Sequence, residues 1–114
     1  MILRISLALR DEALVRRIAE QLASSDNLLE EIPMEGPAWS RLVRCGADMI
    51  ILGQGVIPEP IEHSMALLNG LPESPTTIVL AHSESPDEHA RLLEANCDTV
   101  LYDGLPLERL VGAI

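Results

Sequence analysis

The chain has 114 residues, enough for one domain around one hydrophobic core. Apolar residues make up 47% of it but aromatic residues only 2%, so the core is aliphatic, as in a parallel sheet covered by helices. Eight basic residues stand against eighteen acidic ones, and the net charge of −10 opposes direct contact with nucleic acid or an anionic membrane. No apolar run approaches the roughly 20 residues of a membrane span. We therefore expect a single domain over 1–114 in the cytoplasm.

The first half of the chain predicts two strands that alternate with two helices. Apolar runs bounded by turn residues indicate the strands, and apolar residues at helical spacing indicate the helices. The predicted elements are a strand over 2–9, a helix opened by Asp11 and Glu12, a short edge strand over 28–32 ended by Pro33, and a helix from Pro37 to about Arg44.

The second half continues the alternation. The run from Met49 to Leu52 is uniformly apolar, which is typical of a strand that is covered on both faces. The predicted elements are a strand over 48–53, a helix containing Ile61, Met65 and Leu68, a strand over 76–81, a helix from Ser85 to about Asn96, a strand over 99–103, and a last helix opened by Pro106. Five strands alternating with five helices predict an α/β fold with a parallel sheet and right-handed crossovers.

Four individual side chains carry structural expectations. Ser85, followed by a proline and then by Glu88, predicts a helix N-cap. Cys45 and Cys97 lie far apart with no metal-ligand spacing, so we expect free thiols that are buried or half-buried. Trp39 is expected to pack against the core, with an exposed interface anchor as the alternative.

Open parallel sheets place their functional crevice beyond the C-terminal ends of the strands. Here the first strand runs into Arg10 and Asp11, and three later strands end at Gly53, Ala81 and Asp103. These positions are the candidate site of the chain.

The setting of these residues resembles the receiver domain of response regulators. The sequence Ala47-Asp48-Met-Ile-Ile-Leu-Gly53 is similar to the third strand of that family, and Leu93-Glu-Ala-Asn-Cys-Asp98 is similar to its L-x-A-G-A-D stretch. Leu101-Tyr-Asp-Gly-Leu105 is similar to the L-T-K-P-F stretch. The resemblance covers essentially the whole chain and implies a flavodoxin-like (CheY-like) doubly wound sheet of five parallel strands, in the order 2-1-3-4-5, with five helices.

The resemblance also implies what this site has lost. In receivers the position of Gly53 holds the phosphate-accepting Asp, that of Ala81 a Ser or Thr, and that of Asp103 a Lys. Of the two metal-binding acids only Asp11 remains, and Arg10 takes the place of the other. A phosphoryl group needs a nucleophile and magnesium needs clustered oxygens. We therefore expect no metal, no cofactor and no enzymatic activity.

Two further arrangements at this site stay open. Arg10 and Asp103 have exchanged the signs usual in the family, and they form either an ion pair that holds the site in one conformation or two unrelated solvent-facing charges. His82 follows the fourth strand and either joins Asp11 and Asp103 in a metal site or titrates freely in solvent.

The resemblance implies a phosphorylation-independent pseudo-receiver in bacterial two-component signal transduction, a module for protein contacts that controls the output domain of a transcription regulator. Receivers form dimers through the fourth helix, fifth strand and fifth helix. The corresponding candidate interface residues are Leu92, Val100, Leu105 and Leu107, although each of the three leucines could equally belong to the core.

Two other functional classes remain in view. In the first, the protein is a sensor that binds a small molecule or an anion in the vacated crevice, where Arg10 would pair with the anion. A cryptic transferase is the second, although the sequence shows no nucleophile and base at a suitable spacing.

Overall fold

The computed structural model describes residues 3–22, 27–32, 38–44, 46–71, 75–81, 85–95, 97–102 and 109. Within these ranges five strands alternate with four α-helices and one short 3₁₀ turn. The elements are β1 (Leu3–Ala8), α1 (Glu12–Leu22), β2 (Asn27–Glu31), α2 (Ala38–Arg44), β3 (Met49–Gly53), η1 (Gln54–Val56), α3 (Ile61–Asn69), β4 (Thr76–Ala81), α4 (Pro86–Glu94) and β5 (Thr99–Tyr102).

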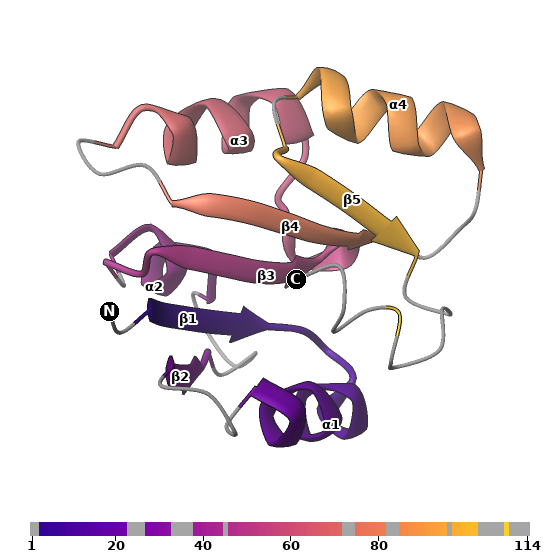
Figure 1. Cartoon of the computed structure of the whole chain (residues 1–114). Helices are drawn as coiled ribbons and strands as arrows, with labels where there is room; N and C mark the ends of the chain where they lie inside the picture. The colour runs from indigo at the N-terminus through magenta and orange to yellow at the C-terminus, as the bar shows by residue number, and fades with distance from the viewer. Residues whose placement is uncertain are drawn as a thin grey trace.

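The strands form one sheet in the order β2-β1-β3-β4-β5, and every neighbouring pair is parallel. Figure 1 shows the arrows side by side and pointing the same way. This confirms the predicted fold class and strand order. The register pairs Ala8 with Leu52, Gly53 with Leu80, and Ala81 with Tyr102. The C-terminal ends of β1, β3, β4 and β5 therefore meet along one edge of the sheet.

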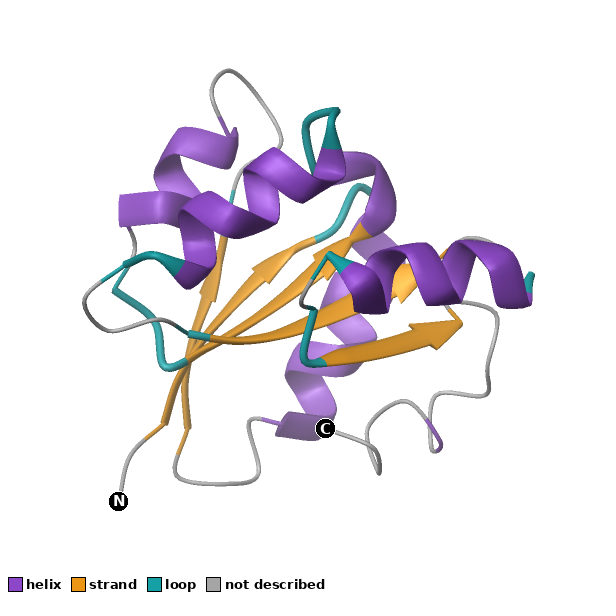
Figure 2. Ribbon diagram, turned by 90° about the horizontal axis from the view of Figure 1, so that it is seen from above, coloured by secondary structure: helices purple, strands orange, loops and turns teal. Residues whose placement is uncertain are grey.

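Helices lie on both sides of the strand layer (Figure 2), and successive strand residues point to opposite faces. One face packs against α1, and the other packs against α2, α3 and α4. The buried residues of the α1 side are Ile5, Leu7, Leu9, Val15, Ile18, Leu22, Ile51, Ile78 and Leu80. The larger cluster on the other side includes Ala8, Leu42, Ile50, Leu52, Ile61, Met65, Leu68, Val79, Ala81 and Leu92.

Both faces of the central strands are buried, which explains why β3 and β4 read as continuous apolar runs. The predicted residues of the third helix, Ile61, Met65 and Leu68, are all buried on one side of α3. Trp39 is half-buried and packs against the larger cluster, as expected. Cys97 is a buried free thiol, also as expected, whereas Cys45 lies outside the described residues.

Two expectations about helices need comment. Ser85 does occupy the N-cap position of α4, but its side chain makes no capping hydrogen bond, so the predicted hydroxyl cap is wrong. The start of α4 rests instead on Pro86 in the first turn and on the acidic Asp87 and Glu88, which suit the positive end of the helix dipole. The predicted fifth helix lies outside the described residues, apart from Arg109.

Candidate functional site

Gly53 ends β3 at the C-terminal edge of the sheet, where the candidate site was predicted. Its backbone is extended, with φ −78° and ψ 148°, so nothing in the conformation requires glycine. A Cβ added there would lie 3.4 Å from Leu9 Cδ2 and 4.0 Å from Val56 Cγ2. A side chain at position 53 would therefore begin against apolar carbon atoms.

Ala81 ends the neighbouring β4 and is completely buried. It pairs with Tyr102 of β5, and its methyl group belongs to the cluster beneath α2, α3 and α4. The side chain at this position therefore presents no polar atom to the edge of the sheet.

Asp11 lies just beyond β1 and is the N-cap of α1. Its Oδ1 accepts hydrogen bonds from the backbone N–H groups of Ala13 (3.1 Å) and Leu14 (3.2 Å). Its carbonyl oxygen accepts the first helical hydrogen bond, from Val15 N at 3.0 Å. The carboxylate accepts hydrogen bonds from N–H groups that a helix start leaves unpaired, so capping of α1 explains why an acid occupies this position.

Arg10 is exposed and reaches across the same edge of the sheet. Its Nη2 donates to the carbonyl oxygen of Gly55 at 3.4 Å, a long hydrogen bond. Asp103 and His82 lie outside the described residues, so the Arg10–Asp103 pair and the His82 metal site stay predictions. Among the residues that are described, no group of three or more His, Cys, Asp or Glu side chains is placed to hold a metal ion.

A hollow of about 270 Å³ opens at this edge, between the ends of β1 and β3 and the start of α1. It is lined by Leu9, Arg10, Asp11, Leu14, Gly53, Gly55, Val56 and Leu80. The predicted residues Arg10, Asp11 and Gly53 are thus brought together, with four aliphatic side chains that sequence reasoning had not assigned to the site.

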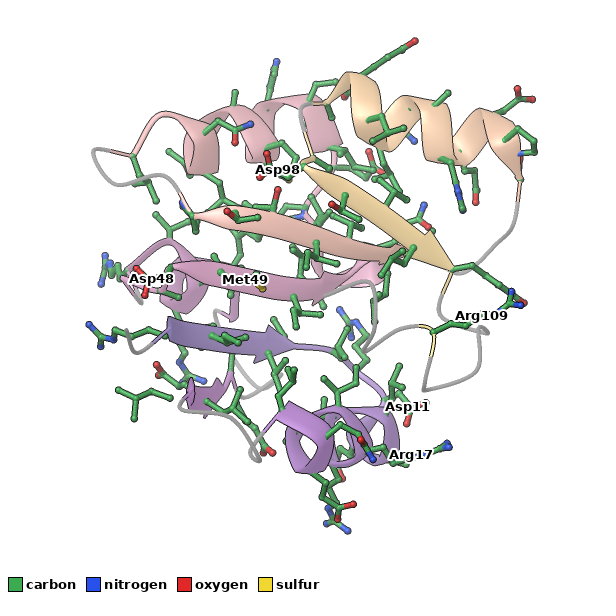
Figure 3. All side chains as sticks on the ribbon, viewed as in Figure 1. Asp11, Arg17, Asp48, Met49, Asp98 and Arg109 are labelled. Atoms are coloured by element: carbon green, nitrogen blue, oxygen red, sulfur yellow. The ribbon has the colours of Figure 1, made fainter. Side chains whose placement is uncertain are left out.

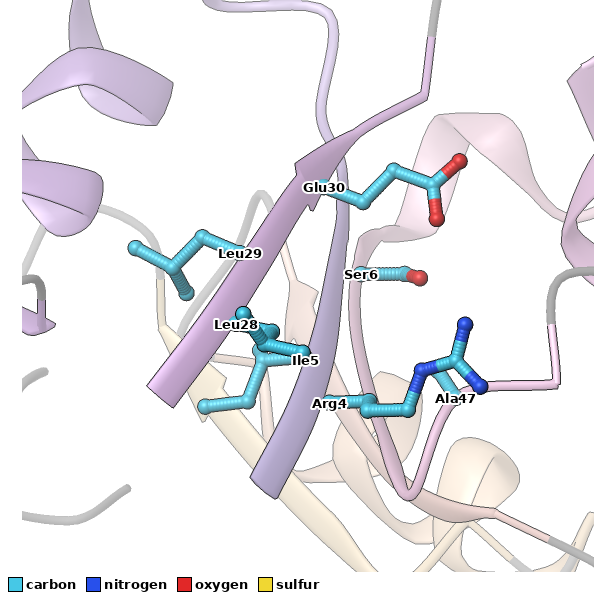
Figure 4. Close-up of a pocket in the computed structure, with 7 residues that line it drawn as sticks. All are labelled: Arg4, Ile5, Ser6, Leu28, Leu29, Glu30 and Ala47. Atoms are coloured by element: carbon cyan, nitrogen blue, oxygen red, sulfur yellow. The ribbon is translucent and has the colours of Figure 1, made fainter. Parts of the chain in front are cut away.

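A smaller hollow of about 90 Å³ lies near the opposite edge, over β1 and β2 (Figure 4). Arg4, Ser6 and Glu30 point to the same side of these two strands. Because one water molecule takes about 30 Å³ of liquid volume, this hollow suits a few waters rather than an organic ligand.

Comparison with known proteins identifies the fold. No protein-family profile and no curated protein sequence matches the chain. Solved structures do match. The phosphorylated cyanobacterial phytochrome response regulator RcpA aligns with a TM-score of 0.77 at 18% identity, over 99% of this chain and 89% of the other. The chain has the receiver fold.

Two further structures show how widely this fold occurs. The signal receiver domain of a LuxO repressor protein from Vibrio parahaemolyticus aligns with a TM-score of 0.77 at 16% identity, covering 99% of this chain and 87% of that one. A pilus assembly-related protein from Burkholderia pseudomallei aligns with a TM-score of 0.74 at 16% identity, covering 97% and 85%. At such identities the similarity establishes the fold alone.

Lysine is absent from the entire sequence, in which all eight basic residues are arginines. No other residue can therefore supply the ammonium group that receivers place at the position of Asp103. This signal was readable from the sequence, but the residue-by-residue comparison with receivers overlooked it.

Two aspartates that sequence reasoning did not single out lie at the opposite, N-terminal edge of this receiver fold (Figure 3). Asp48 Oδ2 accepts from Arg4 N at 3.0 Å, and Asp98 Oδ2 accepts from Thr77 N at 2.8 Å and from Thr77 Oγ1 at 3.3 Å. Asp98 N donates in return to Thr77 Oγ1 at 3.2 Å. Each aspartate precedes a strand and binds the start of the neighbouring one, a pattern visible as an acid just before an apolar run.

The candidate interface needs one correction. Leu92 is only 1% exposed and belongs to the core beneath α4, so it is unavailable for contacts with another protein. Leu93, the next residue of α4, is 52% exposed. Val100 is half-buried and packs against the same core, and Leu105 and Leu107 lie outside the described residues.

An ion-pair network connects α4 with the start of α3. Arg91 binds Glu59 at 2.9 Å and Glu62 at 3.4 Å. The pKa of Glu62 is lowered, first by a hydrogen bond from its own backbone and then by Arg91. All three side chains are about half exposed or more, so we expect this network to orient α4 rather than to contribute much stability.

No helix among the described parts of the chain has the length and apolar character that crossing a membrane requires.

Proposed function

We propose that this domain is a phosphorylation-independent pseudo-receiver, a signalling module that acts through protein contacts and dimerises with a second copy of itself. The observation that carries the proposal is Gly53. It ends β3 without a nucleophile, and the atoms nearest to a Cβ at this position belong to Leu9 and Val56. Aspartyl phosphorylation requires a carboxylate at that point.

The surroundings of Gly53 support the same conclusion. Ala81 has no hydroxyl, and Oδ1 of Asp11 is engaged by the N-terminus of α1. The sequence contains no lysine to pair with a phosphoryl group. We further propose that the module adjoins an output domain that controls transcription, in line with the similarity to the receiver of a LuxO repressor.

The surface of α4 supports the dimerisation part of the proposal. Arg91 is held toward α3 by Glu59 and Glu62. Leu93 follows Arg91 by two residues, which corresponds to a rotation of roughly 200° about the helix axis. The side chain of Leu93 therefore points away from α3. A large exposed apolar side chain at this place suits a contact between two copies.

The phosphorylation part is tested with magnesium and beryllofluoride, and separately with acetyl phosphate, followed by amide NMR and intact mass. With magnesium and beryllofluoride we expect no shift changes at residues 9–14 and 53–56, and with acetyl phosphate we expect no added phosphoryl mass. The variant Gly53→Asp restores the carboxylate alone and is expected to stay unphosphorylated, because the other groups are still missing. A magnesium-dependent, saturable response to beryllofluoride at these residues, or a phosphoryl mass added by acetyl phosphate, would refute the proposal.

The dimerisation part is tested by light scattering over a concentration series. Leu93→Arg should shift the equilibrium toward the monomer by about tenfold or more in Kd, since it places a charge in an apolar contact. Leu67→Arg is the matched control, because Leu67 is also 52% exposed but lies on α3. A protein that is monomeric throughout, or equal effects of the two variants, would rule out the α4 contact.

A further inference from the structure

The hollow at the C-terminal edge has two chemically different parts. Its inner lining, or floor, is apolar, because Leu9, Val56 and Leu80 line the hollow and are each less than a tenth exposed. Leu14, half-buried on the first turn of α1, extends this floor toward solvent. A site for phosphate or for a hydrated metal ion would instead be lined by polar groups.

The rim carries one cation. A guanidinium group has five N–H donors, and the contact from Arg10 Nη2 to the carbonyl oxygen of Gly55 uses one of them at a long 3.4 Å. This contact keeps the charged group over the hollow. The only other charged residue among those lining the hollow is Asp11, whose Oδ1 is directed to the backbone N–H groups of Ala13 and Leu14.

The size of the hollow limits what fits. Its volume of about 270 Å³ is just below the range of about 300–1,000 Å³ that is usual for small-molecule pockets. The absence of a side chain at Gly53 contributes to this space, since a Cβ there would already touch Leu9. The occupant is therefore a small molecule and not a nucleotide.

We propose that this hollow binds a small organic acid with an unbranched aliphatic body of about four to eight carbons. The aliphatic body lies on Leu9, Leu14, Val56 and Leu80, and the carboxylate pairs with Arg10. This inference goes beyond the role in protein contacts and does not depend on it, because the hollow lies at the strand ends and Leu93 lies on α4.

The test is an amide NMR titration of the protein with acetate, butyrate and hexanoate at constant ionic strength, and with hexanol as the uncharged counterpart. Affinity should rise about fourfold for each added methylene group, because each one buries its surface on the apolar floor. Hexanol should bind about tenfold more weakly than hexanoate. The shift changes should centre on residues 9–14, 53–56 and 80.

Three variants separate the two parts of the site, and each changes a side chain at least partly open to solvent, so the fold should survive. Arg10→Gln should weaken hexanoate about tenfold and leave hexanol unchanged. Leu14→Ala should weaken both ligands several-fold. Arg17→Gln is the control with the same loss of charge; Arg17 lies on α1 away from the hollow and should leave both affinities unchanged (Figure 3).

The outcomes that would overturn the inference are equally definite. They are affinities that do not change with chain length, inorganic phosphate binding as tightly as hexanoate, equal weakening by Arg17→Gln and Arg10→Gln, and shift changes centred elsewhere. The pseudo-receiver proposal would survive each of these results, because it concerns covalent phosphorylation at position 53 and contacts through α4 rather than reversible binding in the hollow.

Discussion

The two edges of the sheet differ in the side chains that they carry at the strand ends. At the N-terminal edge Asp48 and Asp98 each precede a strand and bind the backbone of the neighbouring strand. At the C-terminal edge the strand ends carry Gly53 and Ala81, and a hollow with an apolar floor lies beside them. The carboxylates of Asp48 and Asp98 thus connect neighbouring strands at one edge, whereas at the other edge the ends of β3 and β4 have no polar side chain.

The largest expected effect belongs to Asp98. Asp98→Ala should lower the free energy of unfolding by about 2 kcal/mol, because the fully buried Thr77 loses the acceptor for its N–H and its hydroxyl. Urea unfolding measures this. The hydrogen bond from Arg4 N to Asp48 is exposed, so Asp48→Ala should lower the free energy of unfolding by about half as much or less. Equal costs at both positions would show that burial of the partner does not control the effect.

The N-terminal edge should also respond to alkaline pH. Burial, with a smaller contribution from the charge of Asp98, raises the pKa of Cys97 to about 11 from the ordinary 9.0. The folded protein then keeps the thiol proton that the unfolded chain loses, so the free energy of unfolding should fall as pH rises from about 9 to 11, by up to about 2 kcal/mol.

The difference between wild type and Cys97→Ala over this pH range isolates the effect of that one thiol. Cys45→Ala serves as the control, and the absence of lysine keeps the background titration small. A difference that does not depend on pH would contradict the raised pKa.

At the C-terminal edge Asp11 should behave as a helix cap. Asp11→Ala should destabilise the fold by about 1 kcal/mol, and Asp11→Ser should recover most of this, because a hydroxyl also accepts from the N–H groups of the first turn. Thermal unfolding of the wild type and of both variants, with and without magnesium, measures these changes in stability. Stabilisation of the wild type by magnesium, abolished in both variants, would instead assign Asp11 to a metal.

The smallest effect is expected at Gly53. Gly53→Ala should change stability by no more than about 0.5 kcal/mol, and in the stabilising direction, since its extended backbone suits any residue and the new Cβ meets Leu9 at an ordinary contact distance. A loss above about 1 kcal/mol in urea unfolding would show that glycine is required for packing at this strand end.

Much of the fold was predictable because its signals are local. The largely apolar β3 and β4 were predicted to within a residue, since most residues of both strands are buried on either face. The apolar residues of α3 were likewise found from their helical spacing. Helix capping was predicted less well, because Asp11 and Ser85 both precede helices and only the local geometry decides which side chain reaches the N–H groups.

At the candidate site, residue identity alone shows that Gly53 and Ala81 cannot supply a nucleophile or a hydroxyl in any conformation, and the loss of phosphorylation stays a prediction. The exposure of the candidate interface residues could not be read from the sequence. Leu92 and Leu93 are adjacent and chemically identical, and only the rotation of α4 against the sheet buries one and exposes the other.

The sequence by itself determined a parallel α/β domain and the absence of polar side chains at Gly53 and Ala81, because periodicity and residue chemistry are properties of the chain. Only the tertiary structure decided what the remaining residues do. Parallel strand ends far apart in the sequence meet at one edge, where Leu9, Val56 and Leu80 join Arg10 around one hollow. At the other edge the register brings Asp98 to Thr77. Such contacts depend on packing between elements, which no local pattern encodes.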